Sequence, residues 1–228
     1  MNKNKIIHSY NFSRIKRSAL QKLVKINQKI IHSEFDHWFN SQYELNKEIT
    51  IFLEELIVNN KDLIKRYSEE DLKASFIIPL LNKIKFRDIE KEWRDFYHAE
   101  LSYKTKDFIL KGYCDFYVST GIFRPKKPYF FIQEFKQDKN TSHPETQLLA
   151  ELICAVELNN MNFIKGAYIV GEIWNFVILE RLEKHHYQYV VSQNFDSMRL
   201  DDLGEIFKNL LFVKDEIINI MSEEDGKL

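Results

Sequence analysis

The first part of the chain carries apolar residues at the spacing of amphipathic helices. In residues 13–33 they recur between lysines at largely helical intervals, and a second such pattern covers residues 42–60. Ser68 can cap a third helix, because the three residues after it are acidic and suit a first helical turn. The pattern predicts that this helix continues through Leu81.

The pattern changes to strands after residue 88. Residues 96–104 and 107–118 predict a hairpin that turns near residue 105. Residues 128–136 predict another strand, whose centre is apolar on both faces, as is typical in the middle of a covered sheet. Pro144 then opens a predicted helix that runs through residue 160.

The last part of the chain predicts more strands and a final helix. Strands are expected over 163–170 and 173–181, on either side of Gly171, and over 185–192, with the final helix over 201–220. The order of these elements indicates an α/β fold with a mixed central sheet flanked by helices. We expect two parts, which are a helical N-terminal extension (1–67) and a core that ends in a helix (68–228).

The composition favours an ordinary globular protein, with 44% hydrophobic and 29% charged residues. No apolar run reaches the roughly 20 residues that span a bilayer, and the start of the chain lacks the features of a secretory signal. Cys114 and Cys154 fall in predicted core elements and suit a reducing compartment. A cytoplasmic location without a membrane partner is therefore expected.

The net charge of −1 hides an uneven distribution. Residues 1–33 contain no acid, whereas the last third of the chain is rich in acids. A basic segment can bind phosphate groups, but a solvated helix face is the simpler interpretation. The basic residues of this segment are Lys3, Lys5, Arg14, Lys16, Arg17, Lys22, Lys25 and Lys29.

Charged side chains interrupt two neighbouring predicted strands. Asp115 lies within the aromatic strand KGYCDFYV, where Tyr113 and Tyr117 are expected to share its face. Glu134 and Lys136 are two residues apart in PYFFIQEFK and therefore project from one face. A carboxylate within an apolar strand costs free energy unless it has a partner, often a metal. The two strands together predict a site.

The residue types suit phosphodiester hydrolysis. Asp115, Glu134 and the backbone carbonyl of Phe135 are hard oxygen ligands for Mg²⁺, with Mn²⁺ as a substitute. A bound Mg²⁺ activates water and neutralises charge on the phosphate. Lys136 would orient the attacking water and stabilise developing negative charge.

The sequence GYCDFYV, followed by a loop and YFFIQEFK, resembles the core of the PD-(D/E)xK nuclease superfamily. The later stretch GAYIVGEIWNFVILE resembles a strand pair of the nuclease domains of type I restriction subunits and their stand-alone relatives. The resemblance covers roughly residues 68–181. It implies a restriction endonuclease-like core, a catalytic set of Asp115, Glu134 and Lys136, and DNA as the partner of a homodimer or larger complex.

Two helices extend the resemblance. Gln147 follows the strand on the next helix, as in the auxiliary motif of the RecB-like branch, although Glu151 stands where that branch usually has tyrosine. Gln147 and Glu151 lie one helical turn apart and face the same way. The family also places a glutamate on a helix before the sheet, which would be Glu69, with Glu70 as the alternative.

Simpler interpretations exist for each residue. Asp115 could lie in a turn or pair with Lys111 or Lys136, and Glu134 and Lys136 could mark a strand end that emerges into solvent at residues 137–140. Acids are expected at the start of any helix. The histidines lack zinc-ligand spacing, no glycine-rich phosphate loop is present, and Trp174 is expected to pack in the core.

Three functions are compatible with these residues. The first is a Mg²⁺-dependent nuclease that hydrolyses DNA in restriction, defence or repair. The second is a catalytically inactive module of the nuclease fold that binds nucleic acid, with residues 1–33 as a contact surface, or serves in the assembly of a larger machine. The third is a protein-interaction scaffold without a nucleic-acid role.

Overall fold

The computed structural model describes residues 7–30, 33–136 and 143–225. Its first elements are β1 (His8–Asn11), η1 (Phe12–Arg14), α1 (Arg17–Leu23), β2 (Lys25–Gln28), η2 (Ser33–Phe35), α2 (Asp36–Phe39), α3 (Lys47–Asn60), η3 (Ile64–Arg66), α4 (Glu69–Leu72), η4 (Lys73–Ile77) and α5 (Ile78–Ile84). Then follow β3 (Arg87–Asp88), β4 (Trp93–Lys104), β5 (Phe108–Thr120), β6 (Lys126–Lys136), α6 (Pro144–Asn159), β7 (Phe163–Val170), β8 (Ile173–Glu183), β9 (His186–Val191), β10 (Phe195–Asp196) and α7 (Leu200–Asp225).

Within the described residues, the strands form one mixed sheet in the order β2-β9-β8-β7-β6-β5-β4-β3. β1 pairs with β5 and β10 with β8 outside this path. The pairs β1–β5, β2–β9 and β6–β7 are parallel, and the other pairs are antiparallel. Helix α6 provides the crossover that parallel β6 and β7 require. The predicted α/β fold with a mixed central sheet is confirmed.

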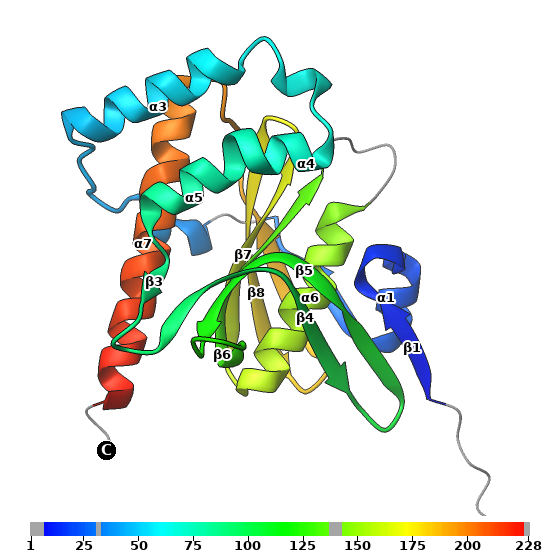
Figure 1. Cartoon of the computed structure of the whole chain (residues 1–228). Helices are drawn as coiled ribbons and strands as arrows, with labels where there is room; N and C mark the ends of the chain where they lie inside the picture. Colours follow the sequence, from blue (N-terminus) through cyan, green and yellow to red (C-terminus); the bar gives the residue numbers. More distant parts are fainter. Residues whose placement is uncertain (1–6, 31–32, 137–142, 226–228) are drawn as a thin grey trace, which may run out of the picture.

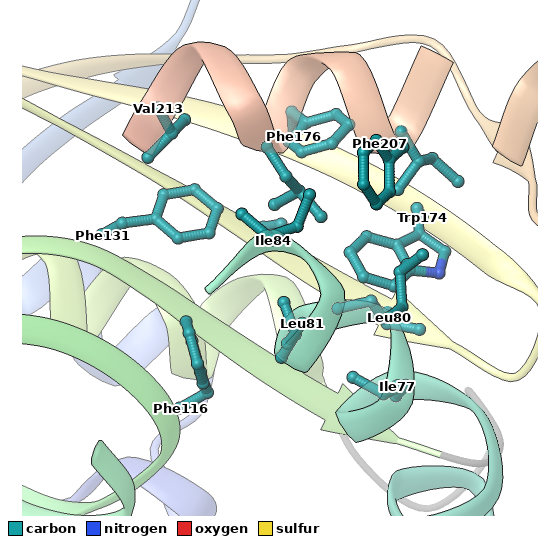
Figure 2. Packing of buried hydrophobic residues seen from close by; sticks show 14 of the residues in the cluster. Ile77, Leu80, Leu81, Ile84, Phe116, Phe131, Trp174, Phe176, Phe207 and Val213 are labelled. Carbon is teal, nitrogen blue, oxygen red and sulfur yellow. The ribbon is translucent and has the colours of Figure 1, made fainter. Parts of the chain in front are cut away.

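Helices cover both faces of the sheet (Figure 1), and each face has its own apolar core. One core lies between the sheet and α5 and α7, and Figure 2 shows Phe116, Phe131 and Trp174 of the strands beside Leu81 and Phe207 of these helices. The other core packs α6 and α1 against the opposite face. The predicted burial of Trp174 is confirmed, because it is fully buried in the first of these cores.

The predicted helix over residues 13–33 is wrong. The segment is α-helical only over Arg17–Leu23, between β1, which pairs with β5, and β2, which pairs with β9. The part expected as a helical extension, residues 1–67, thus adds two strands to the central sheet. Ile26 is buried on β2, whereas Ile30, part of the supposed helical face, is 85% exposed. Lys3 and Lys5 of the basic segment lie outside the described residues.

The helix that begins after Ser68 follows the expected cap. The Ser68 hydroxyl accepts a hydrogen bond from the Asp71 backbone N–H, and the Asp71 carboxylate accepts one in return from the Ser68 N–H. The helix continues to Ile84, but it widens into a π-helix over Lys73–Ile77. Pro79 has no N–H to donate to the preceding turn, which accounts for the widening.

The other predicted elements lie within a few residues of their expected bounds. The hairpin turns at Thr105, whose side chain accepts the N–H groups of Asp107 and Phe108. Gly171 has a φ of 58°, the left-handed conformation that the tight turn between β7 and β8 requires. Among the described helices, none is long and apolar enough to cross a membrane.

Candidate active site

Two adjacent strands bring the predicted acids together. Strand β5 pairs with β6 in antiparallel register with Phe116 opposite Gln133, so Asp115 lies beside Glu134. Ile132 packs into the core under α6, and alternation places Glu134 and Lys136 on that same side of β6. Strands β5 and β6 are consecutive in the sequence and paired in the sheet. The sequence pattern could therefore predict that their acids lie close together.

The charged groups of these strands are in contact. The Lys136 Nζ lies 2.6 Å from Oε1 of Glu134 and 3.9 Å from Oδ2 of Asp115. The backbone N–H of Phe135 donates a hydrogen bond of 2.9 Å to the same Asp115 oxygen. Asp115 is within strand β5 and Glu134 is fully buried. The interpretation of Asp115 as a turn residue is therefore wrong, whereas its predicted pairing with Lys136 is confirmed. Strand β6 does end at Lys136, but Glu134 is not in solvent, and residues 137–140 lie outside the described part of the chain.

The helix before the sheet adds a third acid. Glu69 Oε2 lies 3.4 Å from the Lys136 Nζ, and its Oε1 accepts a hydrogen bond of 2.8 Å from Lys73. Glu70 also contacts Lys73, at 3.3 Å, but its side chain is largely exposed. Of the two glutamates that the sequence left open, Glu69 is the one that reaches the strand lysine.

Lys73 is a site residue that the sequence interpretation missed. Its Nζ donates a hydrogen bond of 3.0 Å to Asp115 Oδ1, so this lysine joins the helix to strand β5. Lys73 begins the π-helical turn, a feature that frequently occurs at functional sites. Its spacing of four residues from Glu69 was the available signal, because such pairs interact on a helix.

The site holds its lysines in the charged form. Burial lowers the pKa of Lys73, but the neighbouring carboxylates of Glu69 and Asp115 outweigh it and the pKa is raised. The pKa of Lys136 is raised in the same way, with Glu134 and Asp115 opposing the effect of burial. Both ammonium groups are therefore available as hydrogen-bond donors at neutral pH.

Glu134 is an unusual carboxylate in this setting. Neither of its oxygens makes a hydrogen bond among the described residues, although Lys136 is close enough for an ion pair. Burial and, second, the negative charge of Asp115 raise its pKa well above the ordinary value, while Lys136 opposes the rise. A buried carboxylate of this kind is a frequent mark of a functional site.

Helix α6 contributes a second buried carboxylate. Gln147 donates a hydrogen bond of 3.2 Å to Glu151 Oε1, as expected for two residues on one helix face, while Glu151 Oε2 has no hydrogen bond among the described residues. Burial, followed by the charge of Glu134, raises the pKa of Glu151. In the described part of the chain, no hydrogen bond or ion pair joins Gln147 to Asp115, Glu134 or Lys136.

The prediction that Tyr113 and Tyr117 lie on one face of β5 is wrong. Cys114 and Tyr117 both pack into the core under α6, so the alternation along β5 is interrupted between them. The interruption lies opposite His98, whose φ of 45° breaks the otherwise regular ladder between β4 and β5. Asp115 consequently faces Glu134, and the Tyr113 ring is 54% exposed.

The donor set bears on metal binding. Asp115, Glu134 and the Phe135 carbonyl offer oxygen ligands of the kind that Mg²⁺ prefers. Among the described residues the Glu134 oxygens accept no hydrogen bond, although Oε1 is ion-paired with Lys136. Asp115 keeps free lone pairs beside its two hydrogen bonds, because a carboxylate has about four acceptor positions. Among the described residues, however, no group of three or more His, Cys, Asp or Glu side chains is arranged to hold an ion by itself.

Comparison with known proteins adds no relative. No protein-family model matches the sequence, and no curated protein matches it at a significant level.

Proposed function

We propose that this protein is a metal-dependent nuclease of the PD-(D/E)xK type that hydrolyses phosphodiester bonds of DNA on a restriction endonuclease-like core. One observation carries the proposal, namely that Asp115, Glu134 and Lys136 of two adjacent strands meet in a buried cluster. Glu69 approaches the same lysine from the preceding helix, as the resemblance implies. Restriction, defence and repair are the settings in which such an activity is used.

The donor set fits Mg²⁺, with Asp115, Glu134 and the Phe135 carbonyl as its ligands. The bound ion would activate water and neutralise charge on the phosphate. The chain itself prepares these ligands, because Lys73 and the Phe135 N–H hold the two oxygens of Asp115 in a fixed orientation. Two protein carboxylates leave room for water and substrate oxygens, which matches the usual coordination of Mg²⁺.

Lys136 would act on the reacting phosphate. Its ammonium is held between Glu69 and Glu134, so its position is fixed by two acids. A donor that is already oriented toward developing negative charge lowers the barrier without reorganisation at the moment of reaction. Glu69 is a positioning residue in this scheme, since it contacts Lys136 and Lys73.

The test is cleavage of duplex, single-stranded and branched DNA by the full chain with Mg²⁺ or Mn²⁺. We expect Asp115→Asn and Lys136→Met each to lower the cleavage rate about 100-fold or more. The matched control is Lys83→Met, because Lys83 pairs with the exposed Glu48 away from the cluster. Absence of cleavage on every substrate, or unchanged rates in both variants, would overturn the proposal.

A second function is favoured by one observation. Lys73 and Lys136 already neutralise the acids of the cluster, and no ready three-ligand group is present among the described residues. Lysines that occupy the metal position favour a nuclease-fold module that binds DNA without cutting it. Calorimetric titration with Mn²⁺ separates the two functions, because only the nuclease requires binding that Asp115→Asn weakens.

A further inference from the structure

An exposed pair of stacked rings lies at the edge of the candidate active site. The imidazole of His98 on β4 and the phenol ring of Tyr113 on β5 have centroids 4.7 Å apart and planes only 6° from parallel. Tyr113 is 54% exposed, and His98 is exposed as well. Most other aromatic residues of these two strands, among them Trp93, Phe96, Phe116 and Tyr117, are buried, so two exposed rings in mutual contact stand out.

The backbone of His98 is strained. Its φ of 45° lies in the left-handed region, which a residue with a side chain rarely adopts within a strand. The neighbours Tyr97 and Ala99 keep their regular partners Phe116 and Cys114, so His98 stands directly across the ladder from Asp115. Strain of this kind persists where the surrounding structure imposes it, often beside a functional site.

A small cavity lies between His98 of the ring pair and Asp115 of the candidate site. It has a volume of about 190 Å³ and is lined by Tyr97 and His98 on one strand and by Asp115 on the next. Lys73 and Glu70 of the preceding helix line it as well. A strand of DNA whose phosphate reaches Asp115 would therefore pass its neighbouring bases over the His98 and Tyr113 rings.

We propose that the His98–Tyr113 stack binds an unpaired base of the DNA strand at the site, and this proposal rests on the proposed nuclease function. Exposed aromatic rings accept any base by its flat face, without reading sequence. The bases of a duplex are stacked on each other and do not offer that face. The substrate class is therefore single-stranded DNA or DNA with a locally unpaired end.

Packing between strands is the alternative explanation of the ring pair, because aromatic cross-strand pairs stabilise sheets. It requires neither the exposure of both rings nor the left-handed backbone of His98. It also makes a different prediction, since loss of a ring would then lower stability and leave DNA binding unchanged.

The test is equilibrium binding of a fluorescent oligothymidylate and of a hairpin duplex of equal length to the full chain, with a chelator present. Tyr113→Leu removes one ring, and His98→Asn removes the other while asparagine tolerates the left-handed backbone. The matched control is Phe123→Leu, because Phe123 is 94% exposed and takes no part in the His98–Tyr113 stack. Circular-dichroism melting of each variant reports on its folding.

We expect both stack variants to bind the single strand about 5- to 100-fold more weakly, with less than about a twofold change for the duplex. Phe123→Leu should bind both probes like the wild type. The base-binding proposal is overturned if folded stack variants bind the single strand normally or lose affinity for both probes equally. In that case DNA cleavage by the wild type would still support the nuclease proposal. Stack-dependent binding without any cleavage overturns only the nuclease, and a wild type that binds neither probe overturns both.

Discussion

The two faces of the central sheet bury side chains of different kinds. Between the sheet and α7 the core consists of apolar and aromatic residues, and the buried Gln133 amide is neutral. The buried carboxylate of Asp95, on the same side of β4 as Trp93, pairs with Arg87 of the edge strand β3. Between the sheet and α6 the buried groups include two carboxylates, Glu134 and Glu151. The two sides are otherwise similar in the depth of their burial.

The difference shows which side of the sheet contains groups whose burial is unfavourable. Burial of apolar surface stabilises the protein by about 25 cal/mol per Å² at any pH. A buried carboxylate is destabilising unless it is paired or protonated, so its effect depends on pH and on its partner. Apolar burial accounts for most of the α7 side, where the carboxylate of Asp95 has an arginine partner at the sheet edge. The carboxylates of Glu134 and Glu151 on the α6 side require another reason, for which the proposed chemistry of the cluster is sufficient.

The largest effect is expected on the apolar side. Phe131→Ala removes a fully buried ring from the core under α7 and should lower the free energy of unfolding by about 3–5 kcal/mol. Urea unfolding at pH 5.5 and pH 8 should give the same loss, because no charge is involved. Phe123→Ala, at an exposed ring, should stay within about 0.5 kcal/mol of the wild type. A marked pH dependence for Phe131→Ala would break the comparison.

On the α6 side, removal of the Lys136 ammonium should lower the free energy of unfolding by an amount that depends on pH. Lys136→Met leaves Glu134 buried without its ion pair and should cost about 3 kcal/mol at pH 8. The loss should shrink at pH 5, because burial raises the pKa of Glu134 and the protonated acid needs no cation. Lys83→Met, at an exposed pair, should cost about 1 kcal/mol or less at both values. Equal losses at pH 5 and pH 8 for Lys136→Met would contradict the expectation.

Glu151→Gln should be more stable than the wild type at high pH, and the difference should grow as the pH rises. The unfolded chain releases the proton of this carboxyl near its ordinary pKa of 4.5, whereas the folded chain, where the pKa is raised, keeps it to higher pH. Wild-type stability therefore falls as the pH rises above 4.5, and the glutamine variant, which does not titrate, avoids that loss. We expect a gain of about 1 kcal/mol at pH 8 relative to pH 4.5, measured by urea unfolding. A destabilised variant at pH 8 would mean that the ionised carboxylate is held by a stabilising partner.

The smallest effect concerns the helix that supplies Glu69 and Lys73. Ser68→Ala removes the capping hydroxyl and should lower the free energy of unfolding by about 0.5–1 kcal/mol. Ser68→Asp keeps a cap and serves as the control. Thermal unfolding should show this order, with Ser68→Ala the lower, and the opposite order would show that the cap does not hold this helix.

Elements with strong local patterns could be predicted from the sequence. Ser68 and Pro144 marked helix starts, and Gly171 marked a turn, because each acts through backbone groups close to it in the chain. The N-terminal segment was wrongly predicted as a helix for the opposite reason. Ile26 belongs to a strand whose partner β9 is some 160 residues away, and no local spacing reports such a partner.

The candidate site divides in the same way. Asp115, Glu134 and Lys136 could be brought together from the sequence, since their strands are consecutive and residues two apart share a face. The contact of Lys73 with Asp115 was not predictable, because it depends on how a helix docks onto the sheet. The shared face of Tyr113 and Tyr117 was mispredicted, because the strand alternation is interrupted opposite the left-handed backbone of His98.

The sequence by itself determined most helices and strands, the mixed α/β class and the identity of the strand acids. These follow from periodicity, capping and turn chemistry, all of which act over a few residues. Only the tertiary structure decided that β1 and β2 join the sheet, that Glu69 reaches Lys136, and that Glu151 lies buried beside Glu134. Burial and ion pairing depend on which distant surfaces pack together, and that is a property of the whole fold.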